Sequence, residues 1–157
     1  MQYFPMTDFN TALQAAFDAG EMLHLNGPIT VDTPISIRMK QSTIGWFGLD
    51  GHGHKITSTI TGAPVIRCFM DGDTPTGTMS RALAFRDLTI VGGGAEGNGL
   101  QIDVPFNDRW IANVELRSLW VENVGGHGIE INGSIFESFG YNVGTQGCHD
   151  CGMHFAN

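Results

Sequence analysis

Three polar residues occupy equivalent positions in a repeated segment and could carry acid–base chemistry. The segments "GLQID", "GIEIN" and "GMHFA" align with one another and place Gln101, Glu130 and His154 at the same position. Apolar residues flank this position on both sides, so a strand would direct the three polar side chains to one outer face. A carboxylate beside an imidazole can exchange protons with a bound substrate, and each group can shift the pKa of the other.

A second carboxylate belongs to a neighbouring column of the same repeat. Asp103 lies two residues after Gln101, and Asn132 takes its place in the next segment. From the usual strand spacings, the backbone positions of Glu130 and Asp103 would be roughly 8 Å apart. Carboxyl groups about 6.5–9.5 Å apart suit an inverting glycoside hydrolase, in which one donates a proton and the other activates water. We therefore predict Glu130, Asp103 and His154 as catalytic residues. Gln101 is predicted to bind substrate, and the alternative is an ordinary solvated polar face.

An insertion and an outward aromatic residue supply further candidates for substrate binding. The segment "FNDRWIAN" lengthens one unit, and loops that project from a rigid scaffold often carry function. Its Arg109 could pair with a carboxylate, and its Trp110 could stack on a sugar ring. Trp120 falls at an outward position between two apolar residues. We predict that all three bind substrate. Alternatively, Trp110 packs against its own loop and Trp120 forms a subunit contact.

The cysteines and histidines near the C-terminal end raise the question of a metal. The segment "CHDCGMH" contains Cys148, Cys151 and His154, and a C-x-x-C pair with a nearby histidine can bind zinc. A structural zinc site needs four ligands, however, and the sequence has no second C-x-x-C pair. Small buried thiols are the alternative. We predict no metal ligands, and we interpret His52 and His54 in "DGHGHK" as part of a glycine-rich corner.

The repeat itself predicts the fold. The stretch "LAFRDLTIVGGGAEGNGLQID" aligns with "VELRSLWVENVGGHGIEIN", and the aligned Gly99, Gly128 and Gly152 are 29 and 24 residues apart. Each unit contains short strands and no helix, and stacked units of this kind bury a continuous apolar column. The G-x-G-x-x-G pattern at Gly92 is followed by a strand, not by the helix that a dinucleotide-binding loop requires, so we interpret it as a corner between strands. The prediction is an all-β solenoid of parallel strands.

One helix precedes the strands. The segment "TDFNTALQAAFDAG" offers Thr7 or Asp8 as N-cap, an apolar face that includes Leu13, and Gly20 as a C-terminal stop. We divide the chain into residues 1–20, an N-terminal segment with a capping helix, and residues 21–157, the stacked strands. Because the sequence stops within a strand, we expect the solenoid to continue in a longer protein or to be covered by a partner subunit.

Composition narrows the functional classes. Charged residues make up only 15%, there are 22 glycines, the net charge is −8 and the pI is about 5.0. This charge argues against nonspecific binding of nucleic acid. No apolar run is long enough to span a membrane, and the N-terminus lacks the features of a signal peptide. The odd number of cysteines indicates synthesis in a reducing compartment.

Taken together, these segments resemble the right-handed parallel β-helix superfamily, which includes pectate-lyase-like enzymes and bacteriophage tailspikes. The resemblance covers about residues 8–157 and rests on "FNTALQAAFDAG", "HLNGPITVDTPISI", "GWFGLDGHGHKITS", "FRDLTIVGG" and "NVGGHGIEI". It implies a helix that plugs the N-terminal end of the coil, a polysaccharide as partner and a homotrimer. A virion-surface or extracellular location follows only if the chain is a tailspike.

The resemblance also bears on the residues that act. Polygalacturonase-like members carry an Asn-Thr-Asp segment, an Asp-Asp pair and a Gly-His-Gly segment, and only the last is matched here, by residues 126–128. It implies that His127 contacts substrate. Calcium is implied only if the chain is a lyase, and otherwise we expect no cofactor. The resemblance and the polar column together predict a polysaccharide-active protein that binds a surface glycan or degrades it as a hydrolase or lyase. The alternative is a non-catalytic trimeric structural or carbohydrate-binding stalk, and a zinc-stabilised module is a third possibility.

Overall fold

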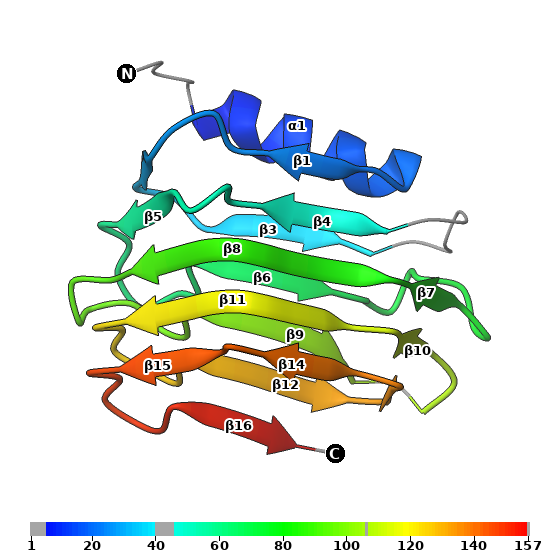
Figure 1. Ribbon diagram of the computed structural model, residues 1–157. Helices are drawn as coiled ribbons and strands as arrows, with labels where there is room; N and C mark the ends of the chain where they lie inside the picture. The colour runs from blue at the N-terminus through cyan, green and yellow to red at the C-terminus, as the bar shows by residue number, and fades with distance from the viewer. Residues whose placement is uncertain (1–5, 40–45, 106, 157) are drawn as a thin grey trace.

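The described part of the chain forms one helix followed by short strands in three parallel sheets (Figure 1). The computed structural model describes residues 6–39, 46–105 and 107–156. Within these residues, no helix is long and apolar enough to cross a membrane. The helix α1 covers Met6–Ala19. An all-β architecture with parallel sheets and a single N-terminal helix, as predicted from the repeat, is therefore confirmed.

The three sheets differ in the number of strands that they contain. The eight-stranded sheet contains β1 (Met22–His24), β2 (Ile29–Val31), β4 (Phe47–Asp50), β5 (Lys55–Ser58), β8 (Leu83–Val91), β11 (Glu115–Glu122), β14 (Phe139–Tyr141) and β15 (Gly144–Gln146). The five-stranded sheet contains β3 (Ile35–Arg38), β6 (Ile66–Phe69), β9 (Leu100–Val104), β12 (Ile129–Gly133) and β16 (Met153–Ala156). The three-stranded sheet contains β7 (Met79–Arg81), β10 (Trp110–Ala112) and β13 (Ile135–Phe136).

The chain visits the three sheets in a repeating order. From β8 it passes through β9 and β10, and it then returns to β11 and continues through β12 and β13. Every strand of one pass pairs in parallel with the equivalent strand of the next pass. In Figure 1 the colours accordingly run from blue at the helix to red at β16, pass by pass.

The register agrees with the alignment of the repeat. Phe85 is the partner of Leu116, and Ile90 is the partner of Val121. The N–H of Leu100 donates to the carbonyl of Gly128, at 3.0 Å, and the N–H of Ile129 donates to the carbonyl of Gly152, at 2.9 Å. The predicted equivalence of Gly99, Gly128 and Gly152 is therefore confirmed, because each directly precedes the equivalent strand of successive passes, β9, β12 and β16.

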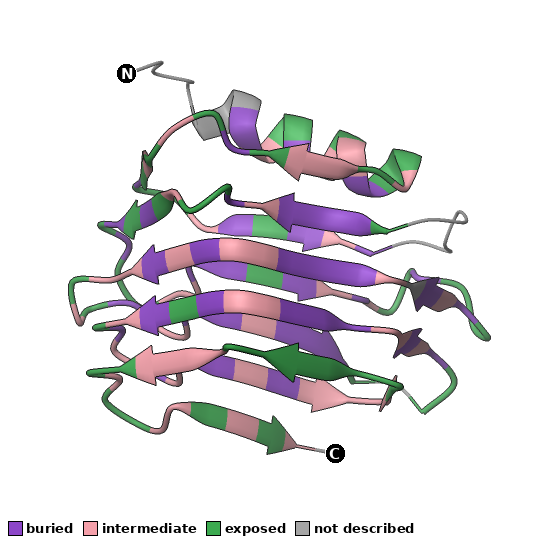
Figure 2. Ribbon diagram, in the orientation of Figure 1, coloured by how far each residue is buried: buried purple, intermediate pink, exposed green. Residues whose placement is uncertain are grey.

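Alternation of buried and exposed residues along the strands builds one apolar interior. In the five-stranded sheet, the inward residues form two columns of apolar side chains that are almost all buried in the first four strands, and the residues between them face outward. Figure 2 shows this as alternating colours along the strands. In the last strands the pattern changes, since Phe139, Tyr141 and Phe155 are 51%, 71% and 69% exposed.

The helix α1 covers one end of the sheets. Phe9, Leu13 and Phe17 are buried, and Phe17 packs edge-on against Phe47 of β4, with ring centroids 5.1 Å apart. The amide side chain of Gln14 accepts from the N–H of Arg38 and donates to its carbonyl, so the helix satisfies backbone groups of the edge strand β3. This agrees with the implied capping role, because unpaired strand edges invite further pairing.

The ends of the helix only partly follow the prediction. Gly20 adopts a φ of 74°, its N–H donates to the carbonyl of Phe17, and the N–H of Glu21 donates to the carbonyl of Ala16. This is a Schellman motif, so the predicted glycine stop is confirmed. The helix begins at Met6, so the predicted N-caps Thr7 and Asp8 lie inside it, and the predicted first helical residue, Asp8 or Phe9, is two or three residues too late.

The glycine bends lead to a stability prediction. A Cβ added at Gly99 would lie 2.2 Å from Cγ1 of Val121 and 2.7 Å from the carbonyl oxygen of Gly128, whereas a Cβ at Gly27 would have no atom within 4 Å. We expect Gly99→Ala to lower the free energy of unfolding by about 1–3 kcal/mol, because the backbone of the next pass must move. Urea denaturation measures this, with Gly27→Ala as the matched control. Equal stability of the two variants would contradict the stacked register at this bend.

Candidate functional site

The outer face of the five-stranded sheet carries the predicted polar column. Gln101 of β9, Glu130 of β12 and His154 of β16 are register partners, as the alignment of the repeat requires. Asp103 and Asn132 form the adjacent column on the same face. Two further members precede them in these columns, namely Arg67 and Phe69 of β6.

Glu130 lies at the centre of a cluster with two imidazoles. Its Oε1 is 3.2 Å from Nδ1 of His154 and 3.9 Å from Nε2 of His127. Its Oε2 accepts a hydrogen bond of 2.5 Å from Nδ2 of Asn98. The two imidazole rings are themselves close, with centroids 4.5 Å apart. Because the Glu130 and His127 side chains are 15% and 22% exposed and His154 is 43% exposed, the cluster can exchange protons with a molecule bound on this face.

His127 is held by the corner that precedes β12. Its backbone N–H donates to Oδ1 of Asn98, at 2.9 Å, and its Nδ1 lies 3.1 Å from Sγ of Cys151. The first contact fixes the backbone and the second orients the ring, whose Nε2 faces Glu130. Asn98 thus contacts both the backbone of His127 and the carboxylate of Glu130, and it also donates to Oε1 of Gln101, at 3.1 Å. Asn98 was not predicted from the sequence, since asparagine is common in glycine-rich turns and does not by itself indicate a functional role.

Asp103 anchors the adjacent column. The residue is 6% exposed, and its carboxylate accepts hydrogen bonds from Arg67 Nε at 2.6 Å, Gln101 Nε2 at 2.9 Å and Asn132 Nδ2 at 3.0 Å. Burial opposes ionisation, but the hydrogen bonds from Gln101, Asn132 and Arg67 and the charge of Arg67 outweigh it and lower the pKa of Asp103. Asp103 is therefore better suited to orient Arg67 and Gln101 than to exchange a proton with a substrate.

The glycine-rich loop that carries Asn98 wraps its backbone N–H groups around one of its own carboxylates. The carboxylate of Glu96 accepts from the backbone N–H groups of Gly93, Gly94 and Ala95, at 2.9–3.1 Å. Glu96 is 4% exposed, and although burial opposes ionisation, the hydrogen bonds from Gly93, its own N–H, Ser58 and Gly94 lower its pKa. These are the N–H groups that a phosphate-binding loop would offer to its ligand. The loop is a corner, as predicted, and its donors are satisfied internally.

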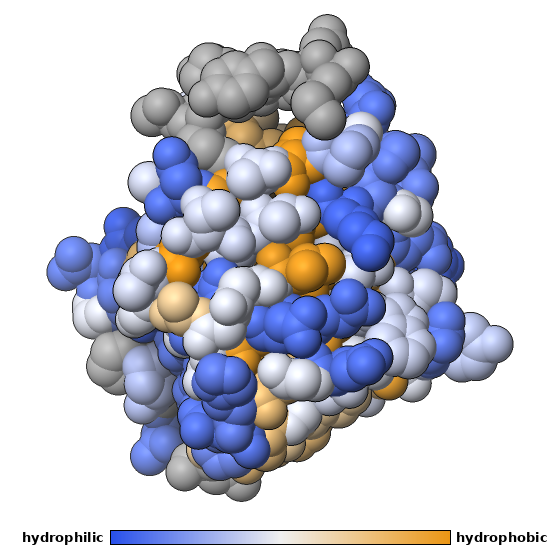
Figure 3. Space-filling view, turned by 90° about the vertical axis from the view of Figure 1, so that its left-hand side faces the viewer, coloured by the Kyte–Doolittle hydropathy of each residue, from blue (hydrophilic) through white to orange (hydrophobic). Residues whose placement is uncertain are grey.

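The next pass stacks on this loop and brings His127 into place. The N–H of Gly126 donates to the carbonyl of Gly97, at 2.8 Å, and a Cβ at Gly125 would lie 2.3 Å from the carbonyl oxygen of Glu96. Only a glycine allows such close contact between the two corners. Figure 3 shows this side of the molecule, where hydrophilic residues dominate and apolar patches are small and scattered.

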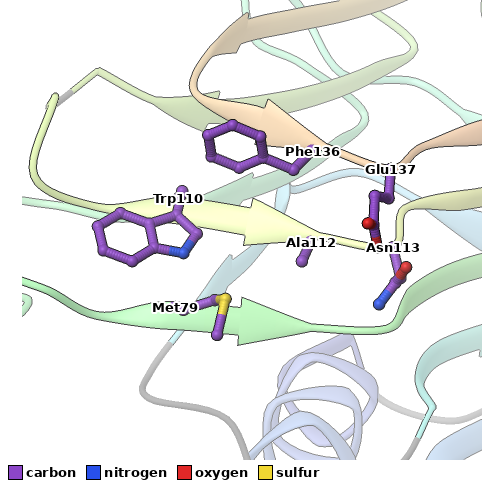
Figure 4. Close-up of a pocket in the computed structure, with 6 residues that line it drawn as sticks. All are labelled: Met79, Trp110, Ala112, Asn113, Phe136 and Glu137. Carbon is purple, nitrogen blue, oxygen red and sulfur yellow. The ribbon is translucent and has the colours of Figure 1, made fainter.

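The other predicted residues lie elsewhere. Arg109 is 6% exposed and donates through Nε to the carbonyl of Thr74, so its guanidinium holds the loop before β7 and faces away from solvent. Trp110 is half-buried and lines a shallow pocket of about 490 Å³ on the outer side of the three-stranded sheet (Figure 4). Trp120 is 41% exposed on the eight-stranded sheet, where its ring lies over Gly144. The structure therefore groups Gln101, Asp103, His127, Glu130 and His154 and separates Arg109, Trp110 and Trp120 from them.

The cysteines make different contacts from one another. Sγ of Cys148 lies 4.0 Å from the carbonyl oxygen of Val121, and burial raises the pKa of this thiol. Sγ of Cys151 instead faces His127. Among the described residues, neither thiol joins a group of three or more potential metal ligands.

The Glu130 cluster is such a group, because the ligand atoms of His127, Glu130 and His154 lie within 4.8 Å of one another. Two of the three are nitrogens. Calcium prefers six to eight oxygens, so these residues do not fit the calcium that the resemblance implies for lyases.

The buried carboxylates predict how stability depends on pH. Because the pKa of Glu96 is lower in the folded protein than in the unfolded chain, ionised Glu96 stabilises the fold fully above the unfolded pKa of about 4.3. This stability is lost as the pH falls through the folded pKa. We expect Glu96→Gln to cost about 1–3 kcal/mol at pH 7, since an amide nitrogen then faces the loop N–H groups, and to cost less at pH 3. Urea denaturation at both pH values measures this, and the exposed Glu21→Gln variant is the control. An equal cost at both pH values would contradict the anion-binding loop.

Comparisons with known protein families, curated proteins and solved structures found no match to this chain. The function must therefore be inferred from the geometry of the site itself.

Proposed function

We propose that the chain forms a right-handed parallel β-helix that binds a polysaccharide across the five-stranded sheet and cleaves it at Glu130. The observation that carries this proposal is the continuous row of hydrogen-bonding side chains that ends in a carboxylate between two imidazoles. The coil is supported by the repeated visits to three sheets and by the in-register parallel pairing of successive passes. A solenoid of this kind presents a long, flat face, which suits an extended polymer.

The binding part of the face combines a cation, amides and an aromatic ring. The guanidinium of Arg67 lies 4.9 Å from the ring centroid of Phe69 and is 44% exposed. Its pairing with Asp103 fixes its position, and donors that remain free can reach sugar hydroxyls or the carboxylate of a uronic acid. Gln101 and Asn132 follow on the next strands and add amide donors and acceptors. Because the chain has a net charge of −8, an anionic glycan needs such a local cation to bind.

The cleaving part of the face is the Glu130 cluster. In a hydrolase, one member of the cluster would protonate the glycosidic oxygen as its bond to the sugar breaks, and another would remove a proton from the attacking water. In a lyase, a base of the cluster would remove the C5 proton of a uronate, a C4–C5 double bond would form as the C4–O bond breaks, and an acid of the cluster would protonate the departing oxygen. Glu130, His154 and His127 supply the acid and base groups for either reaction.

Exposed aromatic residues favour a second candidate, a non-catalytic trimeric stalk. Trp46, Phe139 and Tyr141 are all exposed, Trp46 contacts the Phe139 ring edge-on, and the guanidinium of Arg86 lies 5.2 Å from the Trp46 ring centroid. Together with Trp120 these residues belong to the side of the eight-stranded sheet. Aromatic and arginine side chains of this kind are enriched in protein interfaces.

The enzyme proposal predicts the effect of one substitution. We expect Glu130→Gln to lower the rate of glycan depolymerisation by about 10²–10⁴-fold, because the variant cannot transfer the proton. The protein is incubated with a panel of bacterial capsules and plant uronans, and reducing ends and the absorbance of unsaturated uronates are read in parallel. Glu21→Gln, which changes an exposed carboxylate beyond the helix, is the matched control. Full activity of Glu130→Gln on a glycan that the wild-type protein cleaves would remove this cluster as the site.

The stalk proposal predicts a different response. If the aromatic residues form the subunit interface, Phe139→Ser together with Tyr141→Ser should convert trimers to monomers, because large apolar area is lost at the contact. Sedimentation velocity measures the oligomeric state, and Phe136→Ser, which changes an exposed aromatic residue of the three-stranded sheet, is the control. A wild-type protein that sediments as a monomer would contradict this candidate.

A further inference from the structure

We propose that His24, Asp50 and His52 form a binding site for one divalent transition-metal ion, such as Zn²⁺ or Ni²⁺. The three residues lie at the N-terminal end of the eight-stranded sheet, far along the chain from the Glu130 cluster. His24 ends β1 and Asp50 ends β4, and the two are register partners in the parallel pair. His52 lies in the turn that follows β4. The site is independent of the proposed function.

The ligand atoms already converge. Nδ1 of His24 lies 2.9 Å from Nε2 of His52 and 3.9 Å from Oδ2 of Asp50. Nε2 of His52 lies 3.7 Å from Oδ1 of Asp50. Bond lengths of about 2.0–2.2 Å to zinc place neighbouring ligand atoms roughly 2.9–3.4 Å apart for octahedral to tetrahedral angles. The two nitrogens therefore fit an octahedral site as they stand, and the Asp50 carboxylate must move closer to them, since its Oδ2 lies 3.9 Å from one nitrogen and its Oδ1 lies 3.7 Å from the other.

The backbone holds these side chains in place. The N–H of His52 donates to Oδ1 of Asp50, at 2.9 Å, so the carboxylate and the turn are fixed to each other. His52 adopts a φ of 49°, which is uncommon for a residue with a Cβ. The turn is closed by hydrogen bonds from the N–H of His54 to the carbonyl of Gly51, and from the N–H of Gly53 to the carbonyl of Asp87. The site is thus largely formed before an ion arrives.

The donor set selects the class of ion. Two imidazoles and one carboxylate suit zinc, nickel, cobalt or copper, whereas calcium and magnesium prefer oxygen ligands throughout. The side chains of His24 and His52 are 52% and 53% exposed, so water can complete the coordination and the ion can exchange. The sequence alone groups His52 with His54, two residues later, in a glycine-rich corner. The structure instead pairs His52 with His24, 28 residues earlier.

Metal binding at this site would tie the N-terminal edge to the sheet. β1 pairs with β4 through only three residues, and α1 packs over this end. An ion held by His24, Asp50 and His52 would link β1, β4 and the turn after β4. Binding to the folded protein alone raises its stability by mass action, so the thermal midpoint should rise with the concentration of the ion.

The experiment must separate this site from the His127–Glu130–His154 group, whose ligand atoms also lie close together. We therefore use a background with His127→Gln and His154→Gln. After treatment with a chelator, this protein is titrated with NiCl₂ and with ZnCl₂ by calorimetry, and thermal unfolding is followed by circular dichroism. We expect one equivalent to bind and the thermal midpoint to rise.

Adding His24→Gln or His52→Gln to this background should weaken the binding at least tenfold and abolish the rise of the midpoint. Adding His54→Gln should change neither, which makes it the matched control. Absence of binding in the background, or unchanged affinity after His24→Gln and after His52→Gln, would overturn the proposal. If the background does not fold, the same titrations start from the wild-type protein, and the bound equivalents should fall by one in each of the two variants.

Discussion

The arrangement depends on parallel, in-register hydrogen bonding between successive passes of the chain. The bends at Gly99 and Gly128 contact the backbone of the next pass. A Cβ at Gly99 would lie 2.7 Å from the carbonyl oxygen of Gly128, and a Cβ at Gly128 would lie 2.6 Å from that of Gly152. Because parallel pairing places equivalent residues directly beside each other, one alternating pattern is repeated at every level. Apolar columns then face inward and polar columns face outward over the whole stack. A shift by one residue in any pass would exchange the two faces, so the bends protect both the core and the polar face.

The same stacking can place like charges side by side on the outer faces, and these charges must then be compensated. Arg86 and Arg117 are direct register partners, and like charges in that position destabilise a sheet. Each is relieved by a carboxylate from the other pass, since Arg86 pairs with Glu115 and Arg117 with Asp87 at 3.2 Å. On the five-stranded sheet, Asp103 likewise forms an ion pair with Arg67 of the preceding pass. Glu130 differs from these carboxylates because its ion-pair partners are imidazoles. An imidazole can gain or lose a proton near neutral pH, whereas a guanidinium cannot, so this is the place on the face where proton transfer is possible.

The sequence was sufficient to predict the pairing of the repeated strands, and insufficient to predict the contacts made by the loops, which do not repeat. The pairing of β8 with β11, of β9 with β12 and of β12 with β16 follows from aligned apolar residues. The column of Gln101, Glu130 and His154 follows from the same alignment. Asn98, Glu96 and the pairing of His24 with His52 depend instead on loop conformations, in which single residues such as His52 adopt a positive φ. Strand periodicity carries no information about these conformations, and the burial of Arg109 by a loop carbonyl escaped prediction for the same reason.

The two groups of histidines differ in what surrounds the carboxylate, and this difference separates their chemistry. Oε2 of Glu130 is engaged by Asn98, and Nδ1 of His127 by Cys151, so this cluster is embedded in a network that fixes each group. Such a network favours proton transfer at a defined atom. Around Asp50, the contact with the N–H of His52 fixes only one oxygen, and both imidazoles are about half exposed. Two nitrogens 2.9 Å apart must either share a proton or share a cation. The open trio thus suits an exchangeable ion, and the enclosed trio suits the acid–base chemistry that we propose for it.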